Sequence, residues 1–161
     1  MPNPAVDPVP NPPFPKALNR PERAHLKTFD ELDFVVFSGQ RWDRLGESHA
    51  TNIRVHMPDG SFTDGLTAHI QTLAGLFSYA PDTRIHEHPI RIAKNDLTAV
   101  TGVMRGTFTQ PMQTPNGVVP PNGKKFAINM ATIGLWNRKG VMDEEWLFWD
   151  NLTFLQQLGL A

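Results

Sequence analysis

A dense group of acidic and aromatic side chains lies near the C-terminus, in the stretch DEEWLFWDN over residues 143–151. A carboxylate beside aromatic rings is poorly solvated, so its pKa should rise toward neutral pH, where it can act as a general acid or base. Asp150 is therefore a candidate catalytic residue. The alternative is that Asp150 caps a final helix, because Asn-Leu-Thr opens a helical-looking segment directly after it.

Histidines form the second group of candidates. His86 and His88 lie two residues apart in IHEHP and would share one face of a strand. Three interpretations stay open: one histidine is a general acid or base supported by the other, both are metal ligands, or both are ordinary polar residues of a strand. His69 borders the apolar stripe of a predicted helix and His56 lies on a predicted strand, so both are candidate pocket walls. No third ligand stands at a useful spacing, and we expect no metal site.

Two helices are expected to position these residues. TFDE has the form of a capping box that begins a helix at Thr28, with Phe29, Leu32 and Val36 on one face. The clearest helix is DGLTAHIQTLAGLFSYAP, capped by Asp64. Its apolar residues recur at helical spacing and form a stripe that must pack on the core: Leu66, Ile70, Leu73 and Phe77.

Strands dominate the rest of the chain. TNIRVHMPDGSFTDG predicts a strand, a turn and a short return. Four more strands are expected after Pro81, in DTRIHEHPIRIA, DLTAVTGVMRGTFTQ, KKFAINMATIGLWN and VMDEEWLFWDN. Helices followed by antiparallel strands indicate an α+β fold. The connection over residues 111–123 is long and rich in proline, which is typical of functional loops or subunit contacts.

Side chains alternate along the last strand, and both of its faces carry acids and aromatics. One face holds Met142, Glu144, Trp146, Phe148 and Asp150, and the other holds Asp143, Glu145, Leu147 and Trp149. We expect both faces to be covered. In this interpretation Trp146 and Phe148 line an interior pocket, and Leu147 and Trp149 lie in a contact with a second subunit.

Composition limits the class of protein. The 161 residues suit one domain, and a net charge of −1 gives no basic field to attract nucleic acid or an anionic membrane. The absence of cysteine excludes disulfides and thiolate chemistry. No apolar run is long enough to span a membrane and no signal peptide is visible, which predicts a soluble cytoplasmic protein. Eight of the 15 prolines fall within residues 1–21, so residues 1–27 are interpreted as a Pro-rich arm and residues 28–161 as the domain.

Three segments carry a resemblance to a known family. HPIRIAKNDLTAVTGVMRGTFTQPM, MATIGLWNRKGVMDEEWLFWDN and FLQQLGL resemble the SnoaL-like polyketide cyclases and predicted ester cyclases of the nuclear transport factor 2-like superfamily. The resemblance covers about residues 28–160. It implies a cone-shaped, curved mixed or antiparallel sheet wrapped around N-terminal helices, with a pocket in its mouth and a homodimer formed through the outer sheet face.

The resemblance also implies chemistry. Members of the family close a ring of a polyketide ester by an intramolecular aldol reaction without metal or organic cofactor. Their acid/base aspartate lies in the last strand before the Gln-x-Gly tail, at the position of Asp150. Partner histidines and glutamines lie on neighbouring strands, where this chain has Asn129, Met130 and Thr132. The histidines elsewhere in the chain are candidates for that role.

The sequence hypothesis is a cofactor-free enzyme of the lyase or isomerase class that acts on a small hydrophobic carbonyl compound. Asp150, His88 and His86 are its candidate catalytic residues. The expected substrate-binding residues are His56, His69, Trp146, Phe148, Glu144 and Met130. Two alternatives stay open: a non-catalytic binding module of the same fold, and an epoxide-type hydrolase in which Asp150, Glu144 and Arg84 converge on a water.

Overall fold

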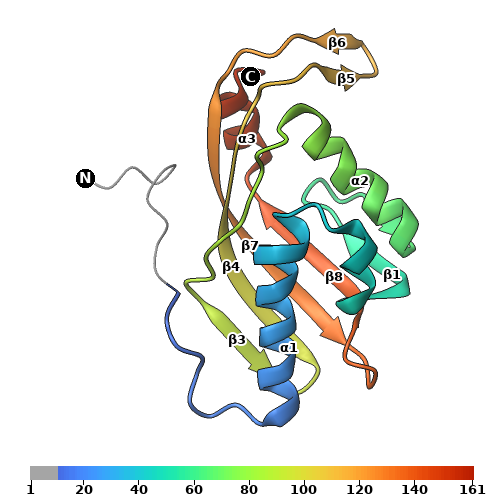
Figure 1. The fold of residues 1–161 in the computed structure, drawn as a ribbon, viewed down its shortest axis with the longest axis vertical. Coiled ribbons are helices and arrows are strands. Elements are labelled where there is room, and N and C mark those ends of the chain that lie inside the picture. Colours follow the sequence, from blue (N-terminus) through green and yellow to red (C-terminus); the bar gives the residue numbers. More distant parts are fainter. Residues whose placement is uncertain (1–10) are drawn as a thin grey trace.

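The computed structural model describes residues 11–161, and its centre is a curved six-stranded sheet with helices on one face (Figure 1). Across the sheet the strands are β2 (Phe62–Asp64), β1 (His49–His56), β8 (Met142–Trp149), β7 (Lys125–Trp136), β4 (Leu97–Thr107) and β3 (Arg91–Lys94). Strands β1 and β8 are parallel and the other neighbours are antiparallel. The α+β class and the mixed, curved sheet are confirmed.

A bulge in β8 shifts its alternation at the start of the strand. Leu135 of β7 pairs with Glu144, but the next residue, Trp136, pairs with Met142, so Asp143 is left over. Because of this extra residue, the side chains before the bulge point to the opposite face of the sheet from the one that simple alternation predicts. As a result Met142 and Glu145 are both buried on the inner face, although they lie three residues apart.

Helices cover the inner face of the sheet. Helix α1 (Arg20–Glu31) continues into a π-helical turn η1 (Leu32–Phe37), and a 3₁₀ segment η2 (Trp42–Glu47) leads into β1. Helix α2 (Leu66–Tyr79) crosses the other half of the sheet. The predicted stripe of α2 is confirmed, since Phe77 is buried and its other three members pack against the core. Asp64 does not cap α2, because its carboxylate pairs with Arg54 at 2.7 Å.

Helix α1 begins earlier than predicted. Asn19 caps it in a reciprocal capping box with Glu22, and Pro21 lies in the first turn. Proline suits that position because its missing N–H would be unpaired there anyway. The capping box predicted at Thr28 was wrong, since Thr28 lies inside α1. Residues 1–10 of the expected arm lie outside the described residues.

The segment before β3 also differs from the prediction. Strand structure was expected over residues 82–93, but β3 covers Arg91–Lys94 alone, with a single bridge from Arg84 to Arg105. Pro89 follows His88 directly and has no N–H to pair with a neighbouring strand. Residues 85–90 therefore run as irregular backbone between the sheet and η1.

Two elements extend the far end of the sheet. The expected loop over residues 111–123 contains a hairpin of β5 (Met112–Thr114) and β6 (Gly117–Val119), which projects at the end of the molecule beside α3 (Figure 1). Helix α3 (Asn151–Leu158) follows β8 directly and packs on β7. Among the described residues, no helix is both long and apolar enough to cross a lipid bilayer.

Candidate active site

A partly open cavity of about 250 Å³ lies between the helices and the inner face of the sheet. Most of its wall is apolar. The apolar lining residues are Leu32, Phe37, Leu45, Met57, Leu73, Leu76, Ile85, Met104, Met130, Leu147, Trp149 and Phe154. Polar residues from five different elements interrupt this wall: Asp33 (η1), His49 (β1), His69, Thr72 and Tyr79 (α2), Thr132 (β7) and Glu145 (β8). A concave apolar space with a few converging polar groups is typical of a ligand site.

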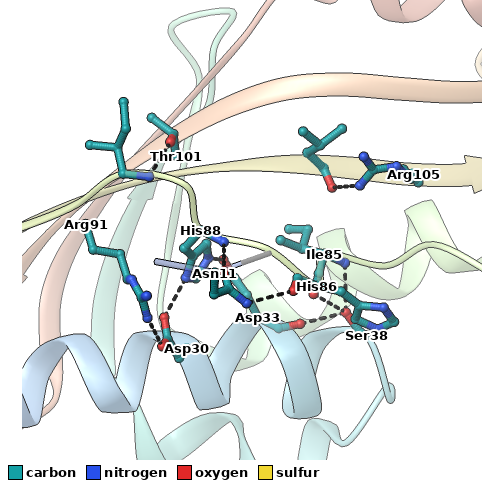
Figure 2. Close-up of polar contacts among 12 residues, drawn as sticks. Asn11, Asp30, Asp33, Ser38, Ile85, His86, His88, Arg91, Thr101 and Arg105 are labelled. Carbon is teal, nitrogen blue, oxygen red and sulfur yellow. Dashed lines mark hydrogen bonds and ion pairs between the residues drawn. The ribbon is translucent and has the colours of Figure 1, made fainter. Parts of the chain in front are cut away.

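Asp33 belongs to a chain of buried charged groups (Figure 2). Its Oδ2 lies 2.7 Å from His88 Nε2, and His88 Nδ1 lies 2.8 Å from Asp30 Oδ1. Arg91 pairs with the other oxygen of Asp30. Gly102 in β4 makes room for the segment that carries His88, since a Cβ there would come within 3.2 Å of the Glu87 carbonyl oxygen. The close approach fixes His88 against the two aspartates.

The electrostatics of this chain differ at its two inner members. Burial raises the pKa of Asp33, although its hydrogen bond to His88 acts in the opposite direction. Burial alone would lower the pKa of His88, but the hydrogen bonds to Asp30 and Asp33 outweigh burial and raise it to about 9. His88 is therefore protonated at neutral pH, and Asp33 is a carboxyl group shifted toward neutral pH on the cavity wall.

A second cluster lies on the same wall. His49 Nε2 is 3.3 Å from Glu145 Oε2, and His69 Nε2 is 3.9 Å from the same oxygen. The two imidazole rings stack with centroids 5.2 Å apart. Burial would raise the pKa of Glu145, but the hydrogen bond and charge of His49 lower it. Burial lowers the pKa of His69 to about 4, so its imidazole is neutral at pH 7.

Two polar atoms of the cavity wall have no partner. His69 Nδ1 and Thr132 Oγ1 are buried and make no hydrogen bond with another described residue. An unpaired buried polar group costs free energy, on the order of 1–3 kcal/mol. A ligand oxygen in the cavity would supply the missing partner. Both atoms are thus candidates to hold a carbonyl group.

Comparison with known proteins identifies the fold family. The family model for the SnoaL-like polyketide cyclase matches residues 30–158. The chain belongs to the SnoaL-like polyketide cyclase family. None of the curated proteins matches it significantly.

Solved structures share the fold of this chain. A candidate SnoaL-like polyketide cyclase from Jannaschia sp. CCS1 superposes with a TM-score of 0.78 at 19% identity, covering 91% of this chain and 99% of that one. IdmH, a candidate polyketide cyclase from Streptomyces antibioticus, gives 0.70 at 25% identity, covering 88% and 99%. AclR, a candidate hydroxylase from Streptomyces galilaeus, gives 0.68 at 17% identity, covering 87% and 98%. AclR is described as a hydroxylase and the other two as cyclases, so a shared fold does not by itself determine the reaction.

The inner face of β8 is opposite to the one expected in the sequence analysis. Leu147 and Trp149 line the cavity, whereas Trp146 lies on the outer face and Phe148 is 50% exposed there. The predicted roles of these four side chains are corrected accordingly. Alternation fixes which residues share a face, but with aromatics on both faces it does not say which face is inside.

Asp150, which the family resemblance singles out, lies outside this cavity. It caps α3, accepting hydrogen bonds from Thr153 N at 3.1 Å and from Thr153 Oγ1 at 2.7 Å. The expectation that aromatic neighbours raise its pKa was wrong, because these hydrogen bonds lower it and the carboxylate is exposed to solvent. The capping alternative describes its position.

The predicted histidines fall in different places. His69 and Met130 line the cavity. His88 is fully buried behind Asp33, while His86 is exposed, so the two do not share a strand face. His56 stacks on Trp146 and pairs with Glu144 at 2.6 Å on the outer side of the sheet.

The predicted site residues did not include Asp33, His49, Thr132 and Glu145, four of the polar residues on the cavity wall. Asp33 is an acid within the otherwise apolar run LDFVVF, which is a signal that sequence reading can use. His49 and Glu145 carry no such local signal, since 95 residues separate them from each other. The trio expected for an epoxide-type hydrolase does not assemble: Glu144 pairs with His56, Arg84 contacts Asp82, and Asp150 caps α3.

Proposed function

We propose that this SnoaL-like protein is an acid/base enzyme that closes a ring within a small hydrophobic carbonyl compound, such as a polyketide ester. The observation that carries the proposal is the pair of carboxyl groups in one apolar cavity, with the pKa of Asp33 raised and that of Glu145 lowered. Titratable groups whose environments separate their pKa values mark distinct acid/base roles.

Asp33 is the proposed general base. Its raised pKa makes its carboxylate a stronger base than an exposed aspartate, and His88 holds it in place at 2.7 Å. Asp33 removes a proton alpha to one carbonyl of the substrate. The resulting enolate carbon attacks a second carbonyl of the same molecule, and the new alkoxide takes the proton back from Asp33. The mass of the substrate is unchanged by this step.

Thr132 and His69 are proposed to hold the enolate oxygen. The Thr132 hydroxyl and the Nδ1 atom of His69 are buried on the cavity wall and have no hydrogen-bond partner within residues 11–161. A neutral imidazole carries one N–H, and with that proton on Nδ1 it donates to the oxygen as charge develops there. The apolar remainder of the wall excludes water, which strengthens these hydrogen bonds.

A model reaction tests the assignment of the base. We expect the protein to accelerate exchange of the α-protons of 1-tetralone, a bicyclic ketone, in D₂O, followed by proton NMR. Asp33→Asn should lose about 100-fold or more of the rate above background. Asp150→Asn is the matched control on the other aspartate and should keep most of the rate. An Asp33→Asn variant as fast as the parent would refute Asp33 as the base.

The same experiment distinguishes the proposed enzyme from a non-catalytic binding module. A protein that binds tetralone, seen as changed NMR line widths, but gives no exchange above background has a pocket without catalysis. Circular dichroism of each variant shows whether the fold is intact, so that loss of rate is not confused with unfolding.

A homodimer and a cytoplasmic location are parts of the same proposal. On the outer sheet face, Phe148 is 50% exposed beside Trp146, and a groove next to it is lined by Pro58, Pro89 and Val103. Aromatic side chains of this kind are enriched in subunit contacts. Phe148→Glu should give a monomer in light scattering at micromolar concentration. Leu155→Glu, on α3 and 40% exposed, is the control that should leave the oligomeric state unchanged.

A further inference from the structure

His49, His69 and Glu145 form a compact set of potential metal ligands on the cavity wall. One ligand atom from each residue lies within 4.8 Å of the others, and all three side chains are buried. The residues come from β1, α2 and β8, so the fold brings them together from three distant parts of the chain. Two imidazoles with one carboxylate are a common donor set for divalent first-row transition metals.

Hydrogen-bond contacts hold His49 against Glu145. Ser48 Oγ lies 3.2 Å from the Leu45 carbonyl oxygen and 2.8 Å from His49 Nδ1. The Nε2 of His49 faces the Glu145 oxygen at 3.3 Å. In the tautomer with its proton on Nδ1, His49 presents the Nε2 lone pair to the carboxylate, and a cation between the two atoms would bond to both.

His69 strengthens the case for a cation. Its ring makes no hydrogen bond with another described residue, and its Nε2 lies 3.9 Å from the shared Glu145 oxygen. A proton on His49 would satisfy His49 and Glu145 but leave His69 without a partner. A metal ion would bond to all three groups at once.

The spacing suits a metal after a small movement. Bonds of about 2.1 Å in tetrahedral geometry separate ligand atoms by about 3.4 Å. The gap of 3.3 Å between His49 and Glu145 already fits, and the gap of 3.9 Å between His69 and Glu145 has to close by about half an ångström. The three ligand atoms lie within 4.8 Å of one another, so the two histidines also have to approach each other. Ser48 orients His49 in the manner of the outer hydrogen-bond partners of metal-bound histidines.

We propose that His49, His69 and Glu145 bind one divalent transition-metal ion, of the Zn²⁺ or Co²⁺ type, with an open coordination position toward the cavity. One carboxylate leaves a net positive charge on such a site, so the open position would take a carbonyl or carboxylate oxygen of the ligand. The proposal goes beyond the acid/base role of Asp33 and does not depend on it. It also departs from the sequence analysis, which expected no metal.

The test is a cobalt titration of untagged protein that has been treated with chelator and dialysed. We expect visible absorption bands that saturate at one Co²⁺ per chain and disappear when Zn²⁺ is added. His69→Ala and Glu145→Gln should each weaken Co²⁺ binding by at least about tenfold, and Ser48→Ala by about tenfold through loss of orientation of His49. His56→Ala is the matched control, because it removes a histidine that pairs with the adjacent glutamate, Glu144, on the outer face.

Either of two results would overturn the metal site. One is a parent protein that shows no saturable Co²⁺ absorption, which needs no variant to fold. The other is equal weakening by His56→Ala and by Glu145→Gln. Asp33→Asn should keep Co²⁺ binding while losing exchange of tetralone protons, so failure of the metal site and failure of the proposed function give different patterns.

Discussion

Two buried clusters of acids and histidines border the same cavity, and they hold His88 and His69 in opposite protonation states. In the first cluster His88 lies between two carboxylates, Asp30 and Asp33, and its pKa rises to about 9. In the second, a single carboxylate serves two histidines, and the pKa of His69 falls to about 4. Both rings are almost fully buried.

The ratio of carboxylates to imidazoles explains the difference. Burial penalises the charged imidazolium in both places, by the same physical mechanism. Two hydrogen-bonded carboxylates outweigh this penalty at His88, whereas a carboxylate 3.9 Å away does not outweigh it at His69. In the first cluster the charged His88 therefore holds Asp33 in place. In the second cluster His69 stays neutral on the cavity wall, where it can bind a metal ion or donate a hydrogen bond. The next three predictions each alter one residue of these two clusters.

The largest effect on stability is expected from Glu145→Ala. Removing one partner of a buried pair leaves the other groups without compensation and should lower the free energy of unfolding by about 3–5 kcal/mol. Glu144→Ala removes the neighbouring carboxylate, whose pair with His56 is about one-third exposed, and should cost about 1 kcal/mol or less. Urea unfolding in the presence of chelator measures both values. Similar losses in the two variants would show that burial does not distinguish the inner pair from the outer one.

The charged histidine predicts loss of stability at alkaline pH. The folded pKa of His88, about 9, lies above its ordinary value of 6.5, so its contribution is complete below pH 6.5 and disappears as the pH rises through 9. The difference in unfolding free energy between the parent and His88→Gln should shrink over this range by an amount on the order of 3 kcal/mol. Urea unfolding at pH 6.5 and at pH 9.5 measures the change. A constant difference would mean that His88 is not charged in the folded protein.

The neutral histidine predicts the opposite dependence. The folded pKa of His69, about 4, lies below its ordinary value of 6.5, so the unfolded chain binds more protons between these limits. The parent should lose stability relative to His69→Gln as the pH falls from 6.5 through 4, again by an amount on the order of 3 kcal/mol. Comparison of the two variants cancels contributions from Asp33 and other acids. Added Zn²⁺ should deepen the loss if the metal site is occupied, because acid would then release the ion.

Local patterns in the sequence predicted the elements better than the site. The stripe of α2 and the buried face that carries Phe29, Leu32 and Val36 follow from helical spacing and are confirmed. Pro21 was interpreted as a helix breaker in a Pro-rich arm, although in the first turn of α1 it favours the helix. Proline favours the first turn of a helix and disrupts its interior. The missed signal was the Asn-x-x-Glu pattern from Asn19 to Glu22, which contains Pro21.

The site depends on contacts that no local pattern encodes. His49, His69 and Glu145 meet because β1 and β8 are parallel neighbours and α2 lies across them. That pairing joins strands at opposite ends of the domain, so spacing along the chain says nothing about it. The wrong cavity face of β8 came from strand alternation, which does not say which of two aromatic faces is inside. The resemblance to the SnoaL-like family predicted the fold but not the cavity residues. It carries topology, whereas the identity of the cavity residues is specific to each chain.

The smallest effect is expected at Asp150, and it tests the role that the family resemblance implied. Asparagine caps a helix about as well as aspartate, whereas alanine cannot accept the hydrogen bond from Thr153 N. Under the capping role, Asp150→Asn should leave the melting temperature almost unchanged, Asp150→Ala should lower it slightly, and both should keep proton-exchange activity. Under a catalytic role, both variants lose activity together, whatever their melting temperatures. Loss of exchange in Asp150→Asn, with Asp33→Asn still active, would move the general base out of the interior cavity and onto the end of β8.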